Sequence, residues 1–533
     1  MHKTTDLKLN LLGIVPGYED ETGRFDPQSI AALSALMTFK GKSIQKLKEE
    51  ALQKDKSFAE QIQKILQNSS LKGHASVATT PVLSFNYEAS KFIDSALTGL
   101  PFASALMHSG RRTGVTLEDI VIPTEIAKKP QAKKLYLEES EQTINLFNEL
   151  LAKGLPKDYV SKILQYGHYG TGIFSLSIES ILAIKREYEL EKEWMPEEVG
   201  LLLQTIESEL KKLGADLLYF TRFVSPSSIY PYPNIFKNPQ NTNLARIMRE
   251  NTNANQLTKI VDYSVDDHPD LKKSLQDLDQ KLRNLVQNKT RFKKEWFGLL
   301  LERQRLVRDF GLAAFVRVLS NVSWRVWGDK KRHRTVPMTV DSIYYAIERA
   351  QKIFFQNARS IENGNITSEL ITKFDQVFSV PDLVRTQKDI LFRWIQQAFS
   401  TLKAYEKLRR MDIKPRDAIF LIPRGIRVDV LQEYNLYNLI SGYYPTRACT
   451  TAEEQLHKLT LWEIQELKKE LQKQGLGYLA DMIKPKCQTL GFCPERKPCA
   501  VVNKLVPDYD EKWHAELQQD LQEKFRQEWQ KLA

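Results

Sequence analysis

Cysteine is scarce in this chain of 533 residues, and long apolar runs are missing. The four cysteines are Cys449, Cys487, Cys493 and Cys499, so the first 448 residues contain none. This distribution excludes a disulfide framework over most of the chain and favours a reducing, cytoplasmic location. Because no apolar stretch reaches about 18 residues, no membrane-spanning helix is expected. The first residues contain no apolar core of a secretory signal, so we expect none.

Negative charge is also in deficit. The chain has 77 lysines and arginines against 66 aspartates and glutamates, a net charge of +11 and a pI of about 9.1. An anionic partner is therefore expected: a nucleic acid, a nucleotide, a polyglutamylated cofactor or an acidic membrane surface. Hydrophobic residues make up 42% of the chain, which is enough for sizeable cores. The length predicts two to four domains, or two large ones.

The last three cysteines, Cys487, Cys493 and Cys499, are separated by five residues each. With a fourth ligand they could hold a structural zinc ion. Candidates for that ligand are Cys449, His457 and His514. The Cys-x2-Cys spacing that is usual in zinc sites is missing, so we favour free structural thiols and predict no metal site.

The segment 224–243 is rich in proline, serine, asparagine and tyrosine, which predicts a linker. On both sides of it the chain follows one layout: an apolar run, an arginine-containing motif, a strand and several helices. That layout indicates a diverged duplication. We predict a first repeat at 1–225, a linker at 226–245 and a second repeat at 246–533, which ends in the cysteine-containing segment. Periodicity predicts strands at 7–15 and 82–87.

A run of cations, Lys330, Lys331, Arg332 and Arg334, surrounds His333 and leads into a β-prone segment. Arginines that such a segment holds in place can bind phosphate or carboxylate through two parallel hydrogen bonds. Taken alone, the run is interpreted as a solvated basic loop.

Two short motifs of the first half combine glycine and serine with histidine or arginine. Gly-His-Ala-Ser at 73–76 precedes the strand predicted at 82–87, and Ser-Gly-Arg-Arg follows at 109–112. The serine, the glycine amide and the first arginine of the second motif could together bind a phosphate dianion, because glycine allows the backbone to approach closely. Taken separately, each motif is interpreted as a turn or as the start of a helix or strand.

Together these motifs resemble the signature of the flavin-dependent thymidylate synthases. That signature begins Arg-His-Arg, ends Ser-x-Arg-Tyr and follows a Gly-His-x-Ser or Gly-His-x-Thr element. The second half keeps Arg-His-Arg at 332–334 but has Ser-Ile-Tyr-Tyr at 342–345. The first half keeps Ser-Gly-Arg at 109–111 but has Gly-Leu-Pro at 99–101. Each half has lost what the other retains, which predicts one shared site rather than random decay of a duplicate.

Two further segments are similar to parts of this family. Lys162 takes the place of an arginine near the nucleotide, and Arg447 matches a second nucleotide arginine. Leu106 and Met107 stand where the family has asparagine and glutamate.

The resemblance implies a role for each residue. The catalytic residues would be Arg332, His333, Arg334 and Arg447. The substrate-binding residues would be Ser109, Gly110, Arg111, Lys162 and Arg447. The cofactor-binding residues would be His74, Ser76, Arg332, His333 and Arg334.

The resemblance also implies a fold, an activity and an assembly. The fold would be α+β and helix-rich, with two diverged repeats that each hold a small, mostly antiparallel sheet. The activity would be FAD-dependent methylation of deoxyuridine monophosphate to thymidylate, with methylenetetrahydrofolate as carbon donor and NADPH as reductant of the flavin. Enzymes of this family are homotetramers with sites between subunits, so a tandem chain would form a homodimer equivalent to a pseudo-tetramer.

Two other functions stay open. A non-catalytic relative of this fold could bind a nucleotide or RNA, which the charge of +11 and the incomplete motif in each half favour. A mainly helical nucleic-acid-binding protein would contain no flavin at all. Colour separates these alternatives, because a flavoprotein is yellow.

Overall fold

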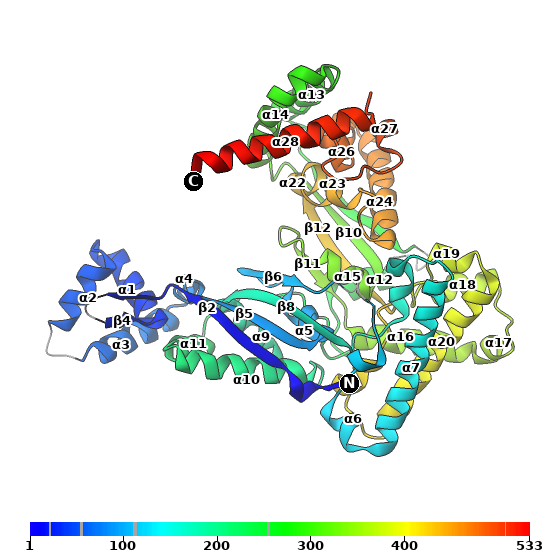
Figure 1. Cartoon of the computed structure of the whole chain (residues 1–533), viewed down its shortest axis with the longest axis horizontal. Helices are drawn as coiled ribbons and strands as arrows, with labels where there is room; N and C mark the ends of the chain where they lie inside the picture. The colour runs from blue at the N-terminus through cyan, green and yellow to red at the C-terminus, as the bar shows by residue number, and fades with distance from the viewer. Residues whose placement is uncertain (21–22, 54–56, 110–113, 253–255, 507, 533) are drawn as a thin grey trace. The chain divides into compact units, whose positions relative to one another are not determined.

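The computed structural model of the chain forms two compact units (Figure 1). It describes residues 1–533 except 21–22, 54–56, 110–113, 253–255, 507 and 533. The first unit contains 1–243, 323–334 and 340–428, and the second contains 244–322, 335–339 and 429–533. The units differ from the predicted repeats because much of the second half of the sequence packs into the first unit. The repeat boundaries therefore stay a prediction.

The first unit contains a four-stranded sheet in the order β2-β5-β8-β6. Its strands are Lys8–Val15 (β2), Val82–Ser90 (β5), Ala103–Met107 (β6) and Tyr169–Ser177 (β8). Each strand pairs antiparallel with its neighbour. Buried and partly exposed residues alternate along β5, because successive side chains of a strand point to opposite faces. The predicted strands at 7–15 and 82–87 are confirmed.

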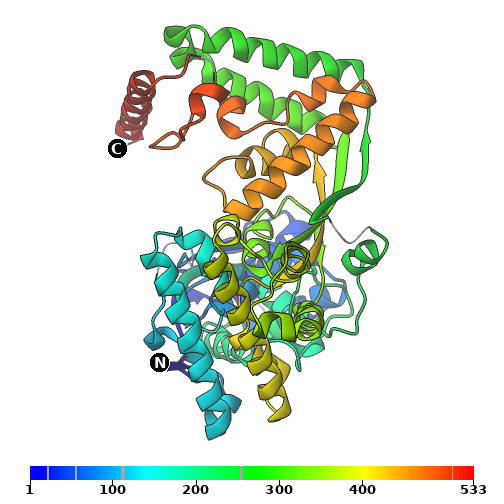
Figure 2. The same cartoon turned by 90° about the vertical axis from the view of Figure 1, so that its right-hand side faces the viewer.

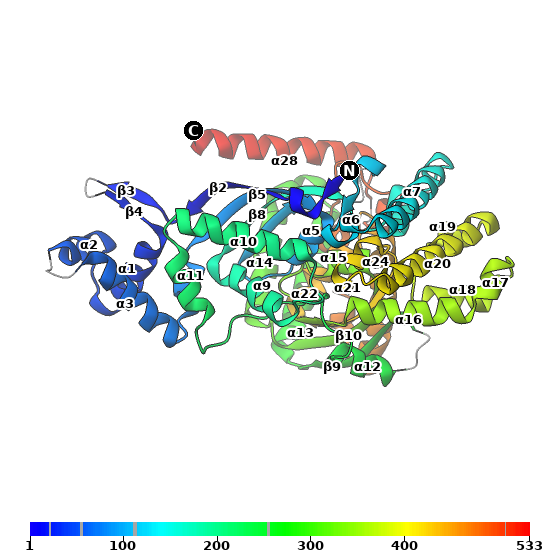
Figure 3. The ribbon, with the colours of Figure 1, turned by 90° about the horizontal axis from the view of Figure 1, so that it is seen from below.

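Helices α9 (Ile178–Leu190) and α10 (Glu197–Lys212) pack together against this sheet (Figure 3). Helix α9 begins directly after β8, where the Ser177 hydroxyl accepts a 3.2 Å hydrogen bond from the Ser180 amide. This bond satisfies a backbone donor that the first turn of a helix leaves without a partner. On the covered face, the rings of Phe85 and Phe174 lie 5.3 Å apart.

Two long helices of equal length, α7 (Pro130–Ala152) and α20 (Lys388–Arg410), lie side by side in this unit (Figure 2). The Lys129 ammonium, at the start of α7, donates to the Met411 carbonyl at the end of α20 over 2.7 Å. At the other end, Glu149 of α7 forms an ion pair with Arg393, near the start of α20. The helices are therefore antiparallel.

The segments that follow these helices also meet. In the first half, α8 (Lys157–Val160) and η3 (Ser161–Ile163) lead toward β8; in the second, α21 (Pro415–Ala418) and η4 (Ile419–Leu421) lead toward β12 (Arg427–Asn435). Gln165 and Pro423 form an antiparallel bridge between the two segments. Equivalent parts of the two halves thus pair as two antiparallel copies.

A second four-stranded sheet has the order β11-β12-β10-β9. Its other strands are Thr258–Val265 (β9), Ala314–Ser323 (β10) and Met338–Val340 (β11). Numbered along the chain, the strands of both sheets lie in the order first, second, fourth, third. This shared order confirms the predicted fold class: helix-rich α+β, with two diverged repeats and a small sheet in each.

The two repeats also agree in local detail. Strand β5 runs into α5 (Lys91–Leu97) at Ser90, and β10 runs into α15 (Trp324–Lys330) at Ser323. In both, the serine hydroxyl accepts a hydrogen bond from a backbone amide of the new helix, over 3.2 and 3.3 Å. The same residue type therefore ends the second strand and starts the next helix in each repeat.

The predicted linker contains no helix or strand between α11 (Asp216–Phe223) and α12 (Leu244–Glu250). It is nevertheless packed, since Ile235 and Phe236 are fully buried and the Phe236 amide donates to the Asn234 side chain over 2.9 Å. No helix in the described part of the chain is both long and apolar enough to span a bilayer.

Candidate functional site

Ser109 lies just beyond the end of β6. The loop is anchored at its start, because the His108 amide donates to the Thr171 carbonyl of β8 over 2.9 Å. Ser109 is half-buried. Gly110 and Arg111, which were predicted to bind phosphate with it, lie outside the described residues.

Arg332 follows the short helix α15, and its side chain is about half exposed (51%). Its guanidinium lies 3.9 Å from the Asp329 carboxylate. The backbone turns at this point, because the His333 amide donates to the Lys330 carbonyl over 3.2 Å. Arg334 is exposed and His333 is half-buried.

Gly99 stands as far from Ser90, which caps α5, as Arg332 stands from Ser323, which caps α15. The Gly-Leu-Pro segment at 99–101 therefore takes the place of Arg-His-Arg in the first repeat. Gly99 has φ of +84°, and an added Cβ would lie 3.4 Å from the Lys331 carbonyl oxygen. The missing side chain of Gly99 thus allows the backbone of the second repeat to approach closely at Lys331.

Ser109 and Arg332 line the same cavity of the first unit, which has a volume of about 290 Å³. This volume is at the lower end of the range for small-molecule sites. The residues lining the cavity are Lys91, Asp94, Ser95, Thr98, Met107, His108, Ser109, Tyr166, Arg325, Gly328, Asp329, Lys331, Arg332 and Arg424. Five of them are lysines or arginines and two are aspartates. The cavity therefore suits an anionic ligand.

The first repeat contributes a buried ion pair to this cavity, between Lys91 and Asp94 of α5. The Lys91 ammonium also donates to the His108 carbonyl, and the Tyr87 hydroxyl donates to Asp94. Burial lowers the pKa of Lys91, although Asp94 opposes the shift. Burial and the nearby Asp94 carboxylate raise the pKa of Tyr87 well above its usual value. These bonds hold the loop before Ser109 against α5.

The second repeat contributes Arg424, which is almost completely buried. Its guanidinium lies 5.3 Å from the centre of the Tyr166 ring and within 2.7 Å of a ring nitrogen of His168. Burial lowers the pKa of Arg424 to about 10. Burial, assisted by Arg424, lowers the pKa of His168 well below its usual value, so this imidazole is neutral and can accept a hydrogen bond.

Of the other predicted site residues, none that the structure describes lines this cavity. His74 and Ser76, at the start of α4 (Ala75–Thr79), are exposed. Lys162 is fully buried in η3, with its ammonium 5.9 Å from the centre of the Tyr159 ring. Arg447 ends α23 (Tyr443–Arg447) and belongs to the second unit.

Sequence reasoning missed several residues of the cavity wall. Lys91 and Asp94 stand three positions apart in a helix whose residues are all buried, which is a signal for a deliberate buried ion pair. Lys331 was part of the recognised cation run but was given no role. Arg424 gave no signal, because its place depends on the pairing of the two repeats.

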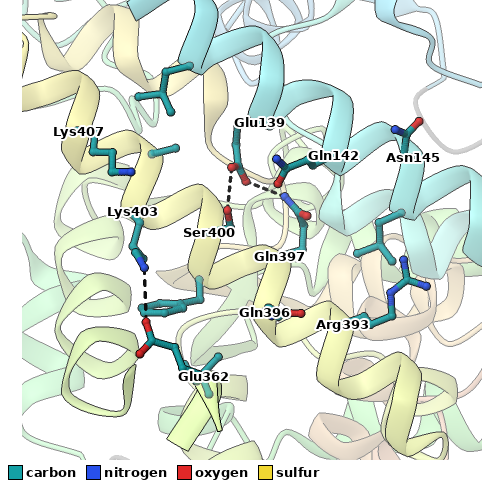
Figure 4. A pocket seen from close by; sticks show the side chains of 15 residues that line it. Glu139, Gln142, Asn145, Glu362, Arg393, Gln396, Gln397, Ser400, Lys403 and Lys407 are labelled. Atoms are coloured by element: carbon teal, nitrogen blue, oxygen red, sulfur yellow. Dashed lines mark hydrogen bonds and ion pairs between the residues drawn. The ribbon is translucent and has the colours of Figure 1, made fainter. Parts of the chain in front are cut away.

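A larger cavity, of about 660 Å³, lies between α7 and α20 (Figure 4). No predicted site residue that the structure describes lines it. Its buried Glu139 accepts hydrogen bonds from Ser400 and Gln397 over 2.8 and 2.7 Å, and its Lys403 lies 3.5 Å from Glu362. Glu139 of α7 thus bonds to side chains of α20 across the helix pair, as in a packing interface.

No group of three or more histidine, cysteine, aspartate or glutamate side chains is arranged to hold a metal ion in the part of the chain that the structure covers. Cys487 and Cys493 are buried in a core of the second unit, with Phe292 and Trp513, and Cys499 packs against it. All four cysteines are free. Burial raises the pKa of Cys487 to about 11, which keeps this thiol protonated.

Known sequences show the family to which this chain belongs. The chain belongs to the thymidylate synthase complementing protein family, whose model matches residues 23–186 and 255–472. One match falls in each half of the chain, in agreement with the two sheets of equal strand order.

Several relatives are flavin-dependent thymidylate synthases. The chain is 24% identical over 123 residues to that of Pyrococcus abyssi, which covers 23% of this chain and 50% of the relative. It is 24% identical over 121 residues to that of Thermococcus onnurineus, which covers 23% of this chain and 49% of the relative. The chain thus spans about half the length of the curated relatives it matches.

Two solved structures are also similar. One is a UMP/dUMP methylase, PolB, from Streptomyces cacaoi with bound 5-Br dUMP; identity is 12%, the TM-score is 0.32, and the match covers 42% of this chain and 100% of that one. The other is the flavin-dependent thymidylate synthase ThyX from Helicobacter pylori with FAD and dUMP; identity is 13%, the TM-score is 0.28, and the match covers 43% and 100%.

Proposed function

We propose that this chain is an FAD-dependent enzyme that methylates deoxyuridine monophosphate to thymidylate, and that the cavity of Ser109 and Arg332 binds the nucleotide. One observation carries the proposal: Ser109 and Arg332, one residue from each retained part of the divided signature, line one cavity. Family membership supports it.

Within the site, each group would act according to its chemistry. Ser109, with Gly110 and Arg111, would bind the phosphate of the nucleotide. Arg332 would place a positive charge where negative charge develops on the pyrimidine. Lys162 and Arg447 stay proposed as further nucleotide contacts.

The exposed donors around the cavity fit a flavin. Arg332 and Arg334 are accessible guanidinium groups that can bind its diphosphate, and the half-buried His333 can stack on a flat ring. His74 and Ser76, also exposed, are proposed as flavin contacts outside the cavity. When bound, FAD supplies the hydride, with NADPH as its reductant and methylenetetrahydrofolate as the carbon donor. The protein would bind and orient the substrates and the cofactor and would exclude water from the site.

The test is production of thymidylate from deoxyuridine monophosphate by the purified chain with FAD, NADPH and methylenetetrahydrofolate. We expect a yellow protein, and a fall in turnover of about 100- to 1000-fold in Arg332→Ala. Arg308→Ala, which removes an exposed arginine of α14 (Lys289–Asp309), should leave turnover unchanged. A colourless protein that takes up no FAD would refute the proposal.

A second candidate is a non-catalytic relative that binds a nucleotide or RNA. It is favoured by Leu106 and Met107, because Leu106 is 75% exposed and Met107 lines the cavity in place of a polar residue. Nucleotide binding without turnover, in the presence of all co-substrates, would establish this function instead. We further propose a homodimer and a cytoplasmic location.

A further inference from the structure

The nucleotide cavity contains a buried lysine, Lys331, that the family signature does not include. Its side chain is only 2% exposed, although it belongs to a run of cations. Its ammonium donates to the Ser95 carbonyl of α5 and lies 4.2 Å from the centre of the Trp327 ring. A buried ammonium is costly unless something on the protein or on a ligand offsets its charge.

The contacts of Lys331 leave it able to bind a ligand. An ammonium has three N–H donors. Among the described residues the Ser95 carbonyl is its one hydrogen-bond acceptor, so two donors remain. Because Lys331 lines the cavity, these donors are available to a molecule bound there.

Several charged or titratable groups share the wall of the cavity with Lys331. They are Lys91 and Asp94 of α5, His108 after β6, Tyr166, Arg325 and Asp329 of α15, Arg332, and Arg424. The cations outnumber the carboxylates. Burial and the adjacent Arg332 lower the pKa of Lys331 well below its usual value, and Asp94 opposes this shift. Without an adjacent anion, the surroundings of Lys331 therefore disfavour its charged form.

We propose that Lys331 binds the anionic group of the ligand directly, and that it takes up a proton from solvent as the anion enters. The identity of the ligand, a phosphate monoester, rests on the function proposed above. The role of the lysine rests on its burial, its contacts and its place in the cavity wall.

The proton uptake follows from electrostatics. A phosphate monoester is a dianion above pH of about 7, since its second pKa is about 6. Its charge raises the pKa of an adjacent amine toward the ordinary value of lysine. At pH values between the pKa of Lys331 in the free protein and its pKa in the complex, binding adds a proton to Lys331. Affinity therefore falls as pH rises through this window.

Calorimetric titration with deoxyuridine monophosphate at pH 8.5, in two buffers of different ionisation enthalpy, tests the proposal. At this pH His108 stays neutral, because burial lowers its pKa. We expect the wild-type chain to take up as much as one proton per nucleotide. Lys331→Met should bind about 10- to 100-fold more weakly and take up less. Lys331→Arg, which is always charged, should keep most of the affinity but lose the uptake.

Thermal unfolding separates a binding role from a structural one. Lys331→Met keeps an unbranched chain over Trp327 and removes a buried charge, so its melting temperature should equal or exceed that of the wild type. Lys134→Met, at a 77% exposed position of α7, is the control and should change neither binding nor stability.

Three outcomes would overturn the role of Lys331: full affinity in Lys331→Met, no proton uptake by the wild type, or a lowered melting temperature with unchanged affinity. If the wild type does not bind the nucleotide, the same titrations are made with inorganic phosphate. Phosphate binding that depends on Lys331 would support the lysine's role while the proposed function fails. A wild type that binds neither would refute both.

Discussion

Ser109 and Arg332 line one cavity of a single chain, although they belong to different halves of the sequence. Each half alone has only part of the signature. Because Ser109 and Arg332 lie within one compact unit, a single chain brings these two residues together.

Subunit mixing tests this arrangement. Arg111 and Arg332 are both proposed for this site, so we expect the variants Arg111→Ala and Arg332→Ala to be inactive in thymidylate production. Mixing them should restore no activity, since every chain retains a damaged site. Recovery of activity after mixing would show instead that the two arginines come from different chains.

The second prediction concerns stoichiometry: one nucleotide should bind per chain. In the second repeat, Ser342 corresponds to Ser109 but is fully buried and caps α16 (Ile343–Gln356), where its hydroxyl accepts from the Tyr344 amide over 3.2 Å. Tyr344 takes the place of the arginine, and its hydroxyl donates to the Trp194 carbonyl. The second repeat thus has buried core side chains at the positions that correspond to Ser109 and the following arginine.

Equilibrium dialysis with deoxyuridine monophosphate measures this ratio. When the capping residues Ser90 and Ser323 are aligned, Lys91 and Asp94 of the cavity correspond to Trp324 and Trp327, which are buried. The second repeat therefore lacks these charged groups, which supports a ratio of one. Two equivalent nucleotides per chain would contradict the prediction.

Much of the fold could be predicted from sequence pattern. Alternation along 82–87 and the shared layout of the two halves led to the correct strands and to the duplication. The units could not be predicted, because compactness depends on contacts between distant segments. The bridge between Gln165 and Pro423 is such a contact, and no local sequence pattern predicts it.

The residues of the candidate cavity could be predicted only in part. Ser109 and Arg332 were found through the resemblance, but Arg424 and Lys91 were not. Both depend on how the two repeats pack, which periodicity does not encode. The role of Lys331 could not be predicted for the same reason, because its hydrogen-bond partner, the Ser95 carbonyl, belongs to the other repeat.

The third prediction concerns the core that joins the repeats. Phe92 of the first repeat is fully buried and stacks on Phe420 of the second, with ring centroids 4.3 Å apart. Its ring also lies 5.5 Å from that of Trp324. Phe92→Ala should lower the free energy of unfolding by about 3–5 kcal/mol, because it leaves a cavity between the repeats.

Chemical denaturation of the wild type, of Phe92→Ala and of a control variant measures this loss of stability. Phe39→Ala, at an 80% exposed position of α1 (Pro27–Lys40), is the control and should change stability by less than about 0.5 kcal/mol. A similar small loss in Phe92→Ala would mean that this ring does not hold the repeats together.

The fourth prediction is a pH dependence of stability that originates in Glu198 of α10. Its buried carboxyl accepts hydrogen bonds from the amide and hydroxyl of Ser90, the amide bond measuring 2.8 Å. Burial raises the pKa of this carboxyl to about 7, although these two bonds oppose the shift. Between pH 4.5 and 7 the folded chain therefore binds more protons than the unfolded chain, and stability falls as pH rises.

Glu198→Gln removes this titration while keeping a side chain that can bond to Ser90. Relative to the variant, the wild type should lose on the order of 3 kcal/mol of unfolding free energy between pH 4.5 and 8. Denaturation at several pH values measures the difference, and Glu141→Gln, at an exposed position of α7, should follow the wild type. Parallel curves for wild type and Glu198→Gln would show that the buried carboxyl does not titrate in this range.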